Sequence, residues 1–272
     1  MRHKGKAPMT PTEARKLGYE FEDPETPVCE HCGRALEALG VPGRDNTVIW
    51  ISRTVCDCDG AKRQVEEERR RAERAAEREL AEAYARSGVK PRFINAEIDS
   101  PALAAYLNGF NERPDVGLYI TGPSRAGKSH SASALAKAFV ASGYSTTMTT
   151  SLAMLDDIKA SFDGGGRPGI ERFISRDVLI IDDLGKENAN SWVMTTLFQI
   201  INARYEAMRP IIVTSQYAPD ELCRRMSRSG ERESAVAITE RLKETSRLIT
   251  LPSRKCPFDG GNPHTTLANL SA

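Results

Sequence analysis

The sequence predicts an α/β fold in which helices cover both faces of a parallel β-sheet. Three observations lead to this prediction. Strand-like and helix-like segments alternate over residues 92–255. A glycine-rich loop at 122–129 joins an apolar segment to an alanine-rich segment. A second apolar segment ends on the adjacent acids Asp182 and Asp183. The chain has 272 residues, which suits one large domain and one smaller domain.

The N-terminal third predicts a small module and a linker. Residues 1–60 are rich in proline and glycine, and they contain four of the six cysteines. A module of this size needs a cross-link, such as a metal ion or disulfides, in addition to its hydrophobic core. Residues 61–86 consist mainly of Glu, Arg and Ala without glycine or proline, which predicts one helix. We assign 61–90 to a charged linker, and a partner-binding arm is the alternative interpretation of its thin apolar stripe.

Residues 91–255 predict the large domain. The apolar segments VGLYIT and VLII indicate buried strands, and STTMTT and PIIVTS indicate two more. These strands are expected at 116–121, 178–181, 145–150 and 210–215. Helices are expected at 128–142, 152–162, 169–175 and 190–208. The last segment, 256–272, shows no periodic pattern, so we expect a C-terminal tail.

The loop from Gly122 to Ser129 matches the pattern G-x-x-x-x-G-K-S/T between a strand and a helix. Backbone N–H groups and the positive end of the helix form an anion site in such a loop. Lys128 then supplies a charge to the β- and γ-phosphates, and Ser129 supplies a hydroxyl to Mg²⁺. The predicted nucleotide-binding residues are Gly122, Pro123, Ser124, Arg125, Ala126, Gly127, Lys128, Ser129 and His130.

Acidic and polar residues end the two strands that follow. Carboxylates at a buried strand end are costly unless they face a cation or water, so Asp182 is predicted to hold Mg²⁺. Asp183 is predicted to orient or deprotonate the attacking water. Gln216 follows the next strand and is predicted to contact the γ-phosphate or the water. The alternative interpretation of Asp182 and Asp183 is a pair of acids that caps the following helix. The alternative for the strand end at Gln216 is a simple turn before Pro219.

The first four cysteines form two close pairs, Cys29 with Cys32 and Cys56 with Cys58. Four thiolates brought to one point fit tetrahedral Zn²⁺. The second pair has one intervening residue, where two are usual, and His31 is an alternative ligand. Free structural thiols and disulfides are the other interpretations.

Bulk composition excludes some classes of protein. The net charge of +1 gives no global attraction to nucleic acid or membrane. No apolar segment is long enough to span a bilayer, and none follows the basic start, so a cytoplasmic location is expected. Basic residues are local, in the segment 2–6, in the arginine-rich predicted helix and in the segment 224–232. The last of these could contact DNA phosphates, and a solvated loop is its alternative interpretation.

Residues 88–255 resemble the AAA+ ATPases that load bacterial and phage replicative helicases, the DnaC/DnaI type, and the related IstB-type transposition helpers. The resemblance rests on the ordered segments SGVKPRFINAEI, GPSRAGKSH, LIIDDLGKE and NSWVMTTLFQIINARYEAMRPIIVTSQY. It implies an AAA+ core that binds ATP and Mg²⁺ at subunit interfaces, self-associates, and hydrolyses ATP slowly with stimulation by partners. It also implies a hexameric helicase and single-stranded DNA as partners, and it supports the N-terminal zinc module.

The resemblance implies roles for two arginines. Arg241 aligns with the arginine that reaches a neighbouring subunit's γ-phosphate, and Arg228 and Arg232 are alternative candidates. Arg254 aligns with the second-sensor arginine of the same subunit. The sequence departs from the family where Arg125 replaces a frequent glycine and Gln216 replaces the usual asparagine. These departures leave three hypotheses, which are a helicase loader, an IstB-like transposition helper, and a nucleotide-binding adaptor without significant turnover.

Overall fold

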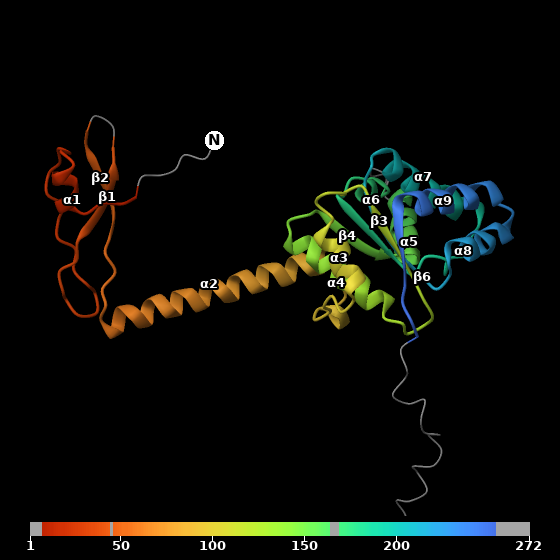
Figure 1. Cartoon of the computed structure of the whole chain (residues 1–272), viewed down its shortest axis with the longest axis horizontal. Coiled ribbons are helices and arrows are strands. Elements are labelled where there is room, and N and C mark those ends of the chain that lie inside the picture. The colour runs from red at the N-terminus through yellow and green to blue at the C-terminus, as the bar shows by residue number, and fades with distance from the viewer. Residues whose placement is uncertain (1–6, 44–45, 164–168, 254–272) are drawn as a thin grey trace, which may run out of the picture. The chain divides into compact units, whose positions relative to one another are not determined.

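The computed structural model describes residues 7–43, 46–163 and 169–253 (Figure 1). The chain forms two compact units, one up to Arg78 and one from Glu79. Helix α2 (Asp59–Arg86) crosses the division and confirms the helix predicted at 61–86. The domain boundaries predicted at residues 60, 90 and 255 stay predictions. The predicted tail, 256–272, lies outside the described residues.

The N-terminal unit contains a short helix and a β-hairpin. Helix α1 (Pro11–Lys16) begins with a reciprocal cap, in which Thr10 accepts a hydrogen bond from the Glu13 N–H and the Glu13 carboxylate accepts one from the Thr10 N–H. Strands β1 (Ala38–Pro42) and β2 (Val48–Arg53) pair antiparallel. One small cluster, Met9, Ala14 and Val48 with Tyr19, Phe21 and Trp50 around it, forms the core beside the hairpin. So small a core agrees with the expectation that this unit needs a cross-link, such as a metal ion or disulfides.

The larger unit is built on a five-stranded sheet in the order β4-β5-β6-β3-β7, and every neighbouring pair is parallel. The predicted fold class is therefore confirmed. Four of the strands match predicted segments, whereas the edge strand β7 was not predicted. The strands are β3 (Gly117–Thr121), β4 (Thr146–Thr150), β5 (Val178–Asp182), β6 (Ile211–Ser215) and β7 (Ser246–Thr250).

Helices cover both faces of this sheet, as predicted (Figure 1). Leu118 and Ile120 of β3 pack with α3 and α4, whereas Tyr119 packs in the cluster formed with α5 to α9. None of the described helices combines the length and the apolar character that crossing a bilayer requires. The helices are α3 (Pro101–Asn108), α4 (Lys128–Ala141), α5 (Ser151–Asp163), α6 (Glu171–Ile174), α7 (Ser191–Glu206), α8 (Pro219–Met226) and α9 (Arg232–Thr245), with 3₁₀ turns η1 (Pro91–Phe93) and η2 (Ser227–Ser229).

A fully buried arginine, Arg204 of α7, ties the end of α6 to the sheet. Burial lowers the pKa of its guanidinium to about 10, so the group is still charged at neutral pH. Its two terminal nitrogens donate five hydrogen bonds of 2.7–3.1 Å to backbone carbonyls of Phe173, Ile174, Arg176, Asp177 and Pro210. These carbonyls satisfy the buried charge in place of an acidic side chain.

We expect Arg204→Met to lower the free energy of unfolding of this unit by about 3–5 kcal/mol, because several buried carbonyls lose their donor together. Urea denaturation followed by Trp192 fluorescence, in a Trp50→Phe background, measures this change. Arg86→Met is the control, because the exposed Arg86 makes only a 3.7 Å ion pair with Glu82. Equal destabilisation by the two variants would refute the structural role of Arg204.

Candidate functional site

The predicted phosphate loop joins the end of β3 to α4. Gly127 precedes the helix with φ of +97°, a left-handed conformation that glycine adopts without strain. The N–H groups of the first helical turn therefore face the loop and form an anion site. Lys128 is buried, and its Nζ donates hydrogen bonds of 2.8 Å to the carbonyl oxygens of Gly122 and Pro123. Burial lowers the pKa of Lys128, and the nearby Asp183 and Asp182 oppose that shift.

Asp182 ends β5 beside this loop. Its Oδ1 accepts hydrogen bonds from the Ser129 hydroxyl at 3.1 Å and the Thr214 hydroxyl at 2.5 Å. The carboxylate is only 5% exposed, so the two hydroxyls are its main compensation for burial. Oxygen atoms of a serine hydroxyl and a carboxylate are a ligand set that fits Mg²⁺.

Asp183 follows in a left-handed conformation, with φ of +61°. Its N–H donates to the Thr214 hydroxyl at 2.9 Å, which links the ends of β5 and β6. Lys186 donates to the Asp183 carboxylate at 2.9 Å, so the two residues form an ion pair. The carboxylate therefore lies at the same sheet edge as the phosphate loop.

The phosphate loop, Asp183 and Gln216 line one cavity of about 360 Å³. Three lining residues, Arg92, Phe93 and Lys186, were not predicted as site residues, although all lie within sequence segments that carry the family resemblance. Asp182 lies beside the cavity, where the Ser129 hydroxyl reaches it. The cavity is lined by Arg92, Phe93, Ser124, Arg125, Gly127, Lys128, Ser129, His130, Asp183, Lys186 and Gln216.

The backbone conformation of Arg125 bears on one departure from the family pattern, the arginine that replaces a frequent glycine. It has φ of +65°, in the region where glycine is favoured and other residues cost about 1 kcal/mol or more. The loop therefore keeps the conformation that glycine would adopt and adds an exposed cation at the cavity.

Arg241 is not among the described residues that line this cavity. Arg241 of α9 lies against the rings of Phe198 and Tyr205, with its guanidinium carbon 5.0 and 5.4 Å from their centroids. One of its terminal nitrogens donates to the carbonyl oxygen of Ala237 at 3.2 Å, whereas its buried Nε has no hydrogen-bond partner. Its predicted role requires a neighbouring subunit and stays a prediction. Arg254 lies outside the described residues.

The four N-terminal cysteines come together as predicted. All their sulfur atoms lie within 4.8 Å of one another. The Sγ atoms are 3.7 Å apart for Cys29 and Cys58, and 3.6 Å apart for Cys32 and Cys56. Tetrahedral Zn²⁺ with bonds of about 2.3 Å sets sulfurs about 3.8 Å apart, so this arrangement fits zinc. None of the four cysteines is in a disulfide, and His31 hydrogen-bonds Gln64 at 2.7 Å.

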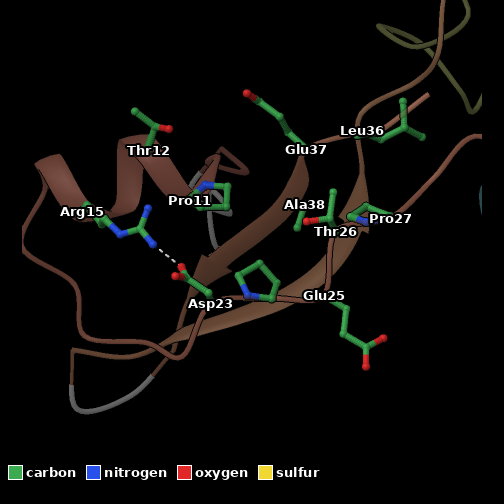
Figure 2. Close-up of a pocket in the computed structure, with 12 residues that line it drawn as sticks. Pro11, Thr12, Arg15, Asp23, Glu25, Thr26, Pro27, Leu36, Glu37 and Ala38 are labelled. Atoms are coloured by element: carbon green, nitrogen blue, oxygen red, sulfur yellow. Dashed lines mark hydrogen bonds and ion pairs between the residues drawn. The ribbon is translucent and has the colours of Figure 1, made fainter.

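A second cavity, of about 490 Å³, lies within the N-terminal unit. Figure 2 shows Arg15 of α1 ion-paired with Asp23, and Glu25 and Glu37 pointing outward from two extended segments. Three prolines also line it, and their fixed backbone angles give rigid walls. It contains none of the predicted site residues.

Comparisons with known sequences place this geometry in a family. Residues 61–254 match the family model described as IstB-like ATP binding protein. The chain is 28% identical over 182 residues to the replicative helicase loader DnaI of Bacillus subtilis, which covers 62% of the chain and 57% of that protein. It is 29% identical over 155 residues to a putative insertion sequence ATP-binding protein of Sinorhizobium fredii, which covers 53% of the chain and 50% of that protein. The matches thus span little more than half the length of these relatives.

Solved structures show the same fold. The crystal structure of the DnaC helicase loader superposes with a TM-score of 0.52 at 22% identity, over 60% of this chain and 99% of that one. The crystal structure of DnaI gives a TM-score of 0.51 at 21% identity, over 58% and 88%. Likeness at this identity establishes the fold, while the family match covers well over half of the chain. The chain therefore belongs to the IstB-like ATP binding protein family.

Proposed function

We propose that this protein is an ATP-dependent loader that places a hexameric replicative helicase on single-stranded DNA, with ATP bound and hydrolysed at subunit interfaces. The observation that carries the proposal is the single cavity that joins the phosphate loop, Asp183 and Gln216. Relatives named as replicative helicase loaders support the choice of partner.

The chemistry assigned to the cavity is ATP hydrolysis. Lys128 and the loop N–H groups hold the phosphates, and Gln216 orients a water molecule. The water oxygen bonds to the γ-phosphorus while the bond to the bridging oxygen breaks, and ADP leaves with that electron pair. The Asp183 carboxylate accepts the water's proton. Arg241 of a neighbouring subunit and Arg254 stabilise the charge on the transferred group.

Ser129 and Asp182 are the residues that would hold Mg²⁺, because their oxygen atoms already meet at 3.1 Å. When bound, the ion neutralises phosphate charge. Lys186 already occupies one oxygen of the Asp183 carboxylate, and this competition with the attacking water is one reason to expect slow basal turnover.

We assign the N-terminal unit to contacts with the protein partner. Residues 7–60 contain ten acidic and five basic residues, a balance that disfavours binding to DNA phosphates. The cavity of Figure 2 is bordered by Glu25 and Glu37 beside the Arg15–Asp23 ion pair, which suits a basic segment of another protein. Ile49 and Ile51 of β2 are each 57% exposed and add apolar contact area. DNA contacts are assigned instead to the basic stretch 224–232.

A transposition helper is the second candidate function, because the family model and the Sinorhizobium relative both carry insertion-sequence names. The cysteine cluster favours the loader, as in the sequence-based hypothesis. A nucleotide-binding adaptor is the third candidate, since Arg125 and Gln216 depart from the family pattern.

The deciding experiment is capture of purified partners by the tagged full-length protein, with and without ATP. We expect the host's replicative helicase to be retained in an ATP-dependent manner, and single-stranded DNA to change the rate of phosphate release. Retention of a transposase in place of the helicase would favour the second candidate. Equal phosphate release by wild type and Lys128→Ala would favour the adaptor.

A further inference from the structure

The turn that carries Asp183 is strained. Asp183, Leu184 and Gly185 follow β5, with φ of +61° at Asp183 and +98° at Gly185. Glycine tolerates such an angle, whereas a residue with a side chain held there costs of order 1–3 kcal/mol and needs surroundings that fix it. The structure must therefore contain groups that hold Asp183 in this conformation.

Every backbone polar group of this turn has a partner. The N–H groups of Asp183 and Leu184 both donate to Thr214, to its hydroxyl and its carbonyl respectively, at 2.9 Å. The Leu184 carbonyl accepts from the Ser215 hydroxyl at 2.7 Å, and the Asp183 carbonyl accepts from the Ser151 hydroxyl at 3.3 Å. The end of β6 and the start of α5 thus hold the first two residues of the turn.

The buried side chain of Glu187 holds Gly185, the third residue of the turn. Its side chain is buried at 6% exposure, and both carboxylate oxygens accept from the Gly185 N–H at 3.0 Å. The same carboxylate accepts from the Ser151 hydroxyl at 2.7 Å. A buried carboxylate is costly, and here its hydrogen bonds all go to the turn and to the serine that supports it.

Arg225 of α8 also holds Gly185, through its carbonyl group. Its Nε donates to the Gly185 carbonyl at 2.6 Å, and its guanidinium carbon lies 5.0 Å from the centre of the Tyr217 ring. Tyr217 follows Gln216, and its carbonyl accepts from the Tyr119 hydroxyl at 2.8 Å. Arg225 therefore connects the turn of Asp183 to the turn of Gln216.

We propose that Glu187 and Arg225 are positioning residues for ATP hydrolysis, which fix the Asp183 carboxylate where it accepts the proton of the attacking water. This rests on the proposed function. Neither residue lines the nucleotide cavity, and both line a separate cavity of about 350 Å³. Their loss should displace Asp183 while the phosphate loop keeps its shape, so catalysis changes and ATP binding does not.

The test uses the full-length protein with Glu187→Gln and Arg225→Met. We expect kcat for ATP hydrolysis to fall by about 10- to 100-fold, the effect of misplacing a reacting group by about an ångström. KM and the calorimetric Kd for ATP should stay within about twofold of wild type, since a uniform loss of binding would change KM. Arg225→Lys keeps a donor for the Gly185 carbonyl, so it should recover part of kcat.

Arg172→Met is the matched control, because Arg172 is exposed on α6 of the same unit, lines neither cavity and should leave kcat unchanged. An unchanged kcat in both test variants would overturn the proposal. A parallel loss of ATP affinity, melting temperature and kcat in all three test variants would also overturn it, because the residues would then be merely structural. Equal phosphate release by wild type and Lys128→Ala would instead refute ATP hydrolysis itself, and the positioning roles with it.

Discussion

We expect Lys128→Ala to lower the affinity for ATP by about 100-fold, the loss that corresponds to two charge-assisted hydrogen bonds to phosphate. The physical reason lies in the position of Lys128 within the loop. Lys128 is 6% exposed, and its ammonium is held at 2.8 Å from the Gly122 and Pro123 carbonyls. Because the Lys128 ammonium already lies inside the loop, its side chain loses little conformational freedom when phosphate binds. We expect phosphate release to fall with binding, to the level of the buffer blank.

Calorimetric titration with ATP and Mg²⁺ measures the loss of affinity, and a phosphate-release assay measures turnover. Lys159→Ala is the control, because Lys159 is exposed on α5 of the same unit. Circular dichroism shows whether the variants fold equally, which matters because two loop carbonyls lose their donor. An ATP affinity in Lys128→Ala within twofold of wild type would contradict the nucleotide site.

Sequence alone predicted the elements whose signal is local. The segments around β3 and β5 are apolar throughout, because both strands are buried on both faces of the sheet. The phosphate loop could be predicted because its spacing is fixed by the chemistry of binding phosphate.

Elements with a weak local signal were missed. Strand β7 lies at the sheet edge, is largely exposed, and follows α9 without a turn residue, so its apolar pattern is faint. The hairpin of β1 and β2 was missed because glycine and proline obscure the alternation in Ala38–Pro42. Helix α3 was also missed, although a proline at its first position after Ser100 is a local signal for the start of a helix.

Tertiary contacts explain what could not be predicted about the site. Arg225 reaches the Gly185 carbonyl across forty positions of sequence, and no spacing rule predicts that contact. Arg92 and Phe93 join the cavity because the segment after α2 packs beside the loop helix, where Lys137 contacts Tyr84 and the Ala96 carbonyl. Local motifs therefore locate the reacting groups, whereas the fold supplies the residues that hold them.

We expect the N-terminal unit to bind zinc and to unfold when zinc is removed, while the larger unit stays folded. Among the described residues of this unit, one cluster buries Met9, Ala14 and Val48, and the other buries Cys29, Cys56 and Ala61. Structural zinc contributes about 10–16 kcal/mol of apparent binding free energy at pH 7, far more than so small a core supplies. Cys56→Ser removes a buried ligand and should have the same effect as a chelator.

Trp50 reports on this unit, because its ring packs edge-on against Phe21 with centroids 5.1 Å apart. In a Trp192→Phe background, we expect chelation to shift Trp50 emission to the red and release one zinc per chain, while calorimetric ATP affinity stays unchanged. Cys223→Ser is the matched control, because Cys223 is a free thiol on α8 of the other unit. The three interpretations of the cysteines differ in outcome. Disulfides predict unfolding by reductant alone, and free thiols predict a metal-free protein with unchanged Trp50 emission. Only a zinc site predicts unfolding that chelator causes, reductant does not, and added Zn²⁺ reverses.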